Sequence, residues 1–120
     1  MLLWKGFARR FPQVGQKGGS VKPMYTTVRR YEGVTDPSEV IRHVNEGFMP
    51  IMSEIEGFVN YSFVDAGEGV LLSISVFEHK SGAEESSWRA GEYIGEHGLA
   101  SMFPNPPQIT EGEVVAHKAK

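Results

Sequence analysis

The side chains of this 120-residue chain that could do chemistry are scattered along it and form no compact motif. Its four histidines lack the HxH, HxxxH and HExxH spacings with which two histidines bind one metal ion. There is no cysteine, no Ser-His-Asp order, no P-loop and no dinucleotide-binding glycine pattern. We therefore expect no metal site and no bound cofactor, so that any chemistry would depend on hydrogen bonds and exclusion of water.

Six residues remain as candidates because their side chains can hydrogen-bond to a ligand or stack on it. The candidate catalytic residues are His79, Asn60 and Tyr61, and the candidate ligand-binding residues are Trp88, Ser62 and Tyr93. His79 ends a predicted strand beside the start of a predicted helix. Asn60 and Ser62 share one strand face. If the helices cover that face, both side chains need hydrogen-bond partners or a ligand. If that face points away from the helices, toward a second subunit, both residues are structural. Trp88 and the tyrosines also suit ordinary packing.

Composition limits the size and class of the protein. At 13.3 kDa and 40% hydrophobic residues, one packed domain is expected. No apolar run approaches the roughly 20 residues of a membrane-spanning helix. The absence of cysteine fits a cytoplasmic protein.

The first 23 residues differ in charge from the rest. They carry five cations and no acid, so they sum to +5, and the remainder sums to −8 because the whole chain has a net charge of −3. An acidic domain is a poor match for nucleic acid. For residues 1–23 we predict a flexible basic extension, followed by one domain over residues 24–120. Translation from Met24 and a basic arm touching a membrane surface are the alternatives.

Residue patterns predict the element order. Residues 25–32 are rich in β-branched and aromatic side chains, which favours a strand. A helix should follow from Asp36 as N-cap, with Pro37 in its first turn, a kink at Pro50 and its end at Gly57. Within it, His43 falls on the polar side.

A hairpin is expected next, from strands over residues 58–65 and 70–79. The second of these has a fully apolar row (Val70, Leu72, Ile74 and Val76) and a mixed row (Leu71, Ser73, Ser75, Phe77 and His79). We predict that the apolar row meets the helices and the mixed row does not.

The remaining elements complete a β-α-β-β-α-β order. A second helix should begin with Ser81 and Glu84 in capping-box spacing, and a last strand should cover residues 113–118. This order predicts an α+β, ferredoxin-like fold: a four-stranded antiparallel sheet with both helices on one face. The sheet face away from the helices should be too apolar to remain exposed to water, so we expect a homodimer.

The same order resembles the antibiotic biosynthesis monooxygenase superfamily of dimeric α+β barrels. Two segments carry the resemblance over residues 24–118: Gly57-Phe58-Val59 and the run from Ser75 to Ser81. The resemblance implies a cofactor-independent monooxygenase that holds an easily oxidised phenol between sheet and second helix. The alternative is a dimeric module that binds or senses a small ligand without catalysis.

This chain departs from the family pattern at informative positions. Many members have tryptophan where Phe77 stands and histidine where Ser86 or Ser87 stands. Haem-degrading members have an asparagine on the first strand, which this chain lacks, and Trp88 and His97 fall on opposite sides of the predicted helix. These departures argue against haem degradation.

Overall fold

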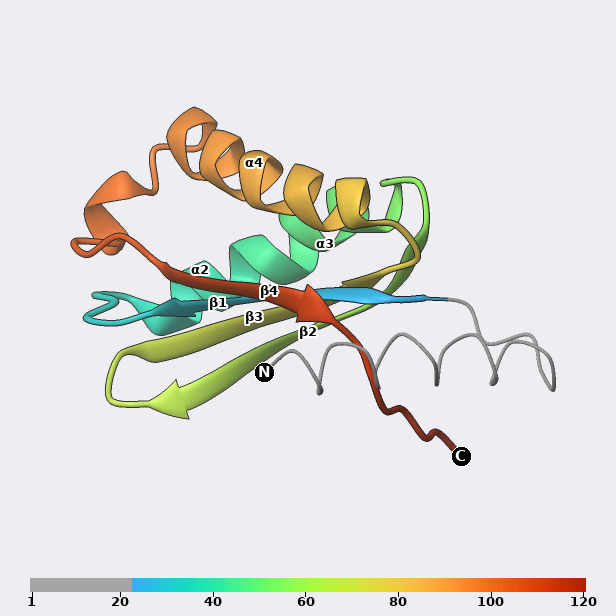
Figure 1. The fold of residues 1–120 in the computed structure, drawn as a ribbon. Coiled ribbons are helices and arrows are strands. Elements are labelled where there is room, and N and C mark those ends of the chain that lie inside the picture. Colours follow the sequence, from blue (N-terminus) through green and yellow to red (C-terminus); the bar gives the residue numbers. More distant parts are fainter. Residues whose placement is uncertain (1–22) are drawn as a thin grey trace, which may run out of the picture.

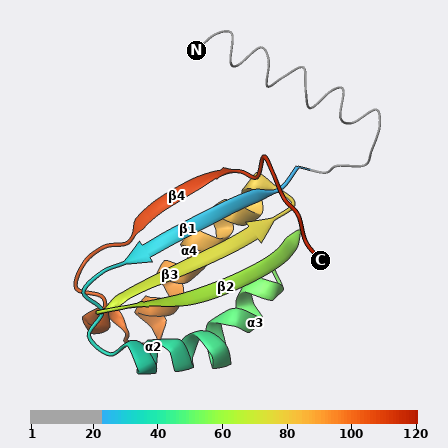
Figure 2. The same ribbon diagram turned by 90° about the horizontal axis from the view of Figure 1, so that it is seen from below.

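The computed structural model describes residues 23–120. Strands β1 (Tyr25–Tyr31), β2 (Phe58–Gly67), β3 (Val70–Phe77) and β4 (Gln108–Glu113) form one sheet in the order β2-β3-β1-β4, with every neighbouring pair antiparallel. The helical segments all lie on one face of this sheet, and the other face is bare (Figures 1 and 2). The predicted ferredoxin-like α+β fold is confirmed. The predicted basic extension lies outside the described residues, apart from Pro23.

The first helical region begins as the sequence predicts and then widens. Asp36 accepts a hydrogen bond from the Glu39 amide, and Pro37 opens α2 (Pro37–His43). A π-helical turn, η1 (Val44–Phe48), then leads into α3 (Met49–Ser53). In the π turn the Met49 amide donates to the Val44 carbonyl, five residues earlier. The next residue, Pro50, has no N–H and cannot donate a helical hydrogen bond.

The second helical region has its N-cap two residues earlier than predicted. Helix α4 (Lys80–Glu96) has His79 at its N-cap, with no side-chain capping bond, so the predicted capping box of Ser81 and Glu84 is wrong. A short 3₁₀ turn, η2 (Ala100–Met102), joins α4 to the loop before β4. Among residues 23–120, no helix is long and apolar enough to cross a bilayer.

The predicted last strand is also wrong. Residues 113–118 lie almost wholly beyond β4, which pairs along β1 from Arg30↔Gln108 to Tyr25↔Glu113. The segment Gln108–Glu113 is exposed throughout and contains a single apolar side chain, Ile109, so its sequence carries little alternation. Backbone hydrogen bonds to β1, not burial of side chains, determine which residues form this strand.

The largest correction concerns the faces of β3. The mixed row faces the helices and is buried from Leu71 to Phe77, with Leu71 and Ser75 0% exposed and Ser73 1% exposed; His79, beyond the end of β3, is exposed. Leu72, Ile74 and Val76 lie on the bare face and stay half-exposed. The serines fit inside because other buried polar groups satisfy their hydroxyls, a condition that periodicity does not reveal.

Two apolar clusters flank these serines. One gathers around Met52 and Phe77, and the other around Val40, Tyr31 and Leu71. Between Leu71 and Phe77 the inner face of β3 presents only Ser73 and Ser75. The centre of the domain is therefore polar, with apolar packing on both sides of it.

Candidate ligand site around Arg29

A cavity of about 40 Å³ lies between the sheet and the two helical regions. Its polar lining comes from Arg29, Ser73 and Tyr61 on the sheet and from His43 and Tyr93 on the helices. The other lining side chains are apolar: Tyr31, Val40, Val44, Phe48, Phe63, Ala90, Ile94, Leu99 and Phe103. At roughly 15 Å³ of such volume per water, the space holds about two or three water molecules.

Arg29 is the unusual member of this lining. It sits near the centre of β1 and is 1% exposed. Its Nη2 donates to Ser73 Oγ at 2.8 Å, and its Nη1 lies 3.3 Å from both Ser86 Oγ and Ser87 Oγ. Its Nε has no hydrogen-bond partner. None of the ion pairs among residues 23–120 includes Arg29.

A buried cation without a carboxylate is costly. Charges taken out of water are normally paired, because neutral hydroxyls replace only part of the lost hydration. A guanidinium always carries its charge and presents its donors as a planar fork. Arg29 lines the cavity and keeps one donor without a partner among residues 23–120. A small anion is the kind of ligand that this guanidinium is suited to bind.

Tyr61 extends this polar centre along β2. Ser73 Oγ accepts from Arg29 and donates to Tyr61 Oη at 2.9 Å. Burial raises the pKa of the Tyr61 phenol, while the hydrogen bond with Ser73 and the charge of Arg29 act in the opposite direction. Tyr61 thus stays a neutral phenol at neutral pH, able to offer its hydroxyl to a ligand.

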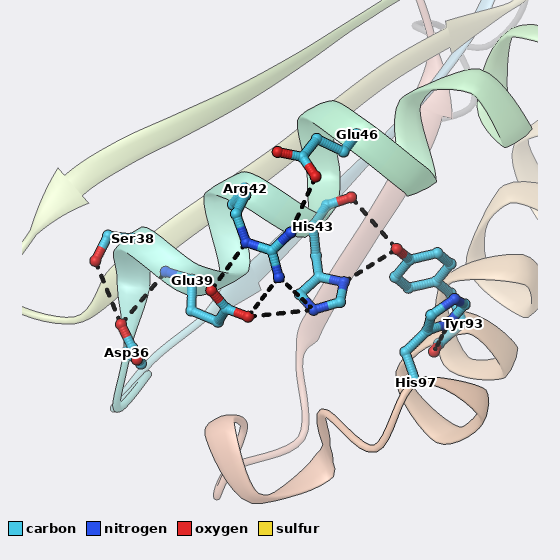
Figure 3. Close-up of polar contacts among 8 residues, drawn as sticks. All are labelled: Asp36, Ser38, Glu39, Arg42, His43, Glu46, Tyr93 and His97. Atoms are coloured by element: carbon cyan, nitrogen blue, oxygen red, sulfur yellow. Dashed lines mark hydrogen bonds and ion pairs between the residues drawn. The ribbon is translucent and has the colours of Figure 1, made fainter.

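His43 and Tyr93 form the polar lining on the helical side of the cavity. Figure 3 shows their polar contacts. Tyr93 Oη lies 3.2 Å from His43 Nδ1, and the Tyr93 ring stacks on His97 with centroids 3.8 Å apart. His43 Nε2 lies 3.5 Å from Glu39 Oε2, which also pairs with Arg42 at 2.6 Å. The hydrogen bond with Arg42 lowers the pKa of Glu39, so this carboxyl is ionised at neutral pH.

The π-helical turn makes room for Tyr93. A Cβ added to Gly47 would lie 2.1 Å from Tyr93 Oη and 3.0 Å from Tyr93 Cζ. Gly47→Ala should therefore displace the tyrosine and lower the free energy of unfolding by about 1–3 kcal/mol, as overpacking does. Gly91→Ala on α4, where an added Cβ meets nothing within 4 Å, is the matched control.

Urea denaturation of both variants measures this difference. Gly91→Ala should be neutral or stabilising by up to about 1 kcal/mol, the propensity gain of alanine over glycine. Equal effects of the two substitutions would contradict the close approach of Tyr93 to the π turn.

The structure brings together only two of the six candidates from the sequence. Tyr61 and Tyr93 both line the cavity. Asn60 and Ser62 pair with Val76 and Ile74 and so lie on the bare face of the sheet. His79 is exposed at the N-cap of α4, and the Trp88 side chain is 63% exposed. In this structure these four residues lie outside the cavity lining.

Sequence reasoning missed Arg29 and the role of His43. The alternation of β1 contained a signal, because Thr27, Arg29 and Tyr31 share the face of a half-apolar strand. His43 was expected on the wet side, yet its side chain is only 19% exposed because Tyr93 packs against it. The two residues are 50 positions apart, so no local pattern indicates their contact.

Comparison with known proteins identifies the fold. No family model and no curated protein matches the sequence. Solved structures do match, among them a monooxygenase of Streptomyces coelicolor that holds the ligand nanaomycin D. It is 13% identical with a TM-score of 0.59, over 83% of this chain and 93% of that one.

Two further structures agree with this result. A protein of unknown function from Nitrosomonas europaea is 14% identical, with a TM-score of 0.65 over 85% of this chain and 98% of that one. A variant of a cofactor-independent oxygenase from Streptomyces nogalater is 15% identical, with a TM-score of 0.54 over 80% of this chain and 95% of that one. Such identities establish the fold and leave the reaction open. The chain therefore has the fold of the antibiotic biosynthesis monooxygenase superfamily.

Proposed function

We propose that this protein is a cofactor-independent monooxygenase that binds a small phenol as its anion beside Arg29 and lets molecular oxygen react with it. The observation that carries the proposal is the buried guanidinium, whose Nε and charge find no partner and no carboxylate among residues 23–120. A phenolate oxygen is a single compact anionic acceptor and would accept from this donor. The similarity of fold to a monooxygenase and a cofactor-independent oxygenase supports the reaction class.

The chemistry requires an electron-rich anion and a dry site. A phenolate can transfer electron density to oxygen, so that a C–O bond forms at a ring carbon and a hydroperoxide results after protonation. Loss of the ring proton and cleavage of the O–O bond then release water and leave a quinone. One phenol and one O₂ thus yield one quinone and one water. Arg29 would stabilise the phenolate, and the apolar lining would exclude water.

Tyr61 and Tyr93 would orient the ring through their hydroxyls, because both line the cavity and a phenol hydroxyl can donate and accept. The cavity of about 40 Å³ is far smaller than the roughly 300 Å³ of typical ligand pockets. Substrate entry therefore requires α4 or the Phe103 segment to move away from the sheet. Closure behind the substrate would then remove water from the site.

Oxygen consumption by the metal-free protein tests this function. The protein is incubated in air with a panel of mono- and dihydroxylated aromatics, and oxygen uptake is followed with an electrode. We expect uptake above that of buffer and of heat-denatured protein for at least one phenol. Saturable thermal stabilisation by a phenol without any uptake would instead identify a non-catalytic ligand-binding module.

A further inference from the structure

Three side chains form a path from the cavity to solvent (Figure 3). Tyr93 lines the cavity, and its Oη lies 3.2 Å from His43 Nδ1. On the other side of the imidazole, Nε2 lies 3.5 Å from Glu39 Oε2. The side chains become more exposed along this path, with His43 at 19% and Glu39 at 34%. A proton that leaves the cavity through Tyr93 thus has a path of close polar contacts toward solvent.

The geometry suits both protonation states of His43. A neutral imidazole donates from one nitrogen and accepts at the other. If Nε2–H points at Glu39, Nδ1 is free to accept the Tyr93 hydroxyl proton. If the ring is protonated, Nδ1–H donates to Tyr93 Oη, and the tyrosine hydroxyl can donate to the His43 carbonyl, 3.4 Å away. Neither state leaves a donor without a partner.

We infer that Tyr93 and His43 accept the proton of the bound phenol, an inference that rests on the proposed function. The O–H bond of the phenol breaks as its proton passes to Tyr93 Oη, and the Tyr93 O–H bond breaks as its proton passes to His43 Nδ1. The products are a phenolate beside Arg29 and an imidazolium beside Glu39. No atom or charge leaves the complex in this step. Tyr93 is thereby a catalytic residue that touches the substrate.

Tyr61 cannot fill this role, although it lines the same cavity. Its hydroxyl accepts from Ser73, and Ser73 in turn accepts from Arg29. Neither neighbour is a base, since a guanidinium has no acceptor and a serine hydroxyl is a very weak one. The two cavity tyrosines thus differ in what lies behind them, and this difference makes Tyr61 the matched control.

Charged and titratable groups face His43 from its own helix, from α4 and from the sheet. Glu39 and Arg42 face it from its own helix and form an ion pair, and Arg42 also reaches Glu46 at 2.9 Å. From α4, Tyr93 and His97 face it, with the two histidine rings 5.9 Å apart. From the sheet, Arg29 and Tyr61 line the same cavity. Both members of this ion pair lie close to Nε2, with Glu39 Oε2 at 3.5 Å and Arg42 Nη2 at 3.4 Å.

The pH dependence of ligand affinity tests the inference without turnover. Under nitrogen, para-nitrophenol is titrated into the wild-type protein and into Tyr93→Phe, His43→Gln and Tyr61→Phe variants, with phenolate absorbance as the readout. At pH values below the pKa of the free probe where the free protein still holds His43 as a neutral imidazole, the wild type should bind the probe as phenolate with an almost constant Kd, because the proton stays on the protein. The Tyr61→Phe variant should show this same pH profile.

The Tyr93→Phe and His43→Gln variants should behave differently. They must bind the phenolate that already exists in solution, so their Kd should rise about tenfold for each pH unit below the probe's pKa. Above that pKa their Kd should no longer depend on pH, and saturable binding there also shows that they are folded. Identical profiles in all four proteins would overturn the proton transfer and leave phenol binding standing. Absence of saturable binding to the wild type would overturn the proposed function itself.

Discussion

The Arg29→Met variant should lose phenolate affinity by about 30-fold or more while keeping its stability. A charge-assisted hydrogen bond contributes about 2 kcal/mol, which is about 30-fold in Kd. Methionine has a similar length and no charge to desolvate, so the free energy of unfolding should stay constant or rise by about 1 kcal/mol. Titration with para-nitrophenol above its pKa and thermal melting measure the two quantities.

The serines around Arg29 explain why stability should survive. Ser86 Oγ still donates to the Ala83 carbonyl at 2.7 Å, and Ser73 Oγ still donates to Tyr61 Oη. Arg29→Lys is the matched control, because it keeps the charge and loses the planar fork. It should bind the anion more weakly than the wild type and more tightly than Arg29→Met. A methionine variant that melts well below the wild type would show that Arg29 joins β1 to α4 structurally and serves no ligand.

The second large effect concerns the bare face of the sheet, which we propose to be covered by a second copy of the chain. Ile74 lies at its centre, with Val28 beside it on β1 and Ser62 on β2. Ile74→Lys should convert a micromolar solution from dimer to monomer, because each subunit would bury an unpaired ammonium at about 3–5 kcal/mol. Sedimentation velocity should give twice the 13.3 kDa chain mass for the wild type and that mass once for the variant.

Ser101→Lys adds the same charge at an exposed position in η2, away from the bare face, and should leave the dimer intact. A wild-type protein that sediments only as single chains at micromolar concentration would contradict the proposed pairing. A dimeric Ile74→Lys variant would place the interface on another surface.

The row of β3 that lies on the bare face differs from the one that the sequence suggested. The sequence suggested that the mixed row of β3 needed a partner subunit, but the helices bury that row. The row left bare contains Leu72, Ile74 and Val76 and is more apolar than the one expected there. An exposed row of this kind on a central strand marks an interaction surface more strongly than the mixed row would have done.

The sequence by itself determined the element order and several element boundaries. Asp36 and Pro37 begin α2 because capping by a carboxylate and the fixed φ of proline act over three or four residues. The hairpin between β2 and β3 follows from Glu68 and Gly69, both at positive φ, in a short turn. The ferredoxin-like topology then follows, because few arrangements of this order avoid crossed connections.

Only the tertiary structure decided which face of the sheet meets the helices and where the polar groups meet. Alternation along β3 separates its two rows but does not say which is covered, since that depends on whether the serines find partners on β1 and α4. Likewise His43 meets Tyr93, and Arg29 meets Ser86, across more than 45 residues of chain. Long-range hydrogen bonds of this kind depend on how the elements pack against one another. Local residue patterns predict only contacts between residues that are close in the sequence.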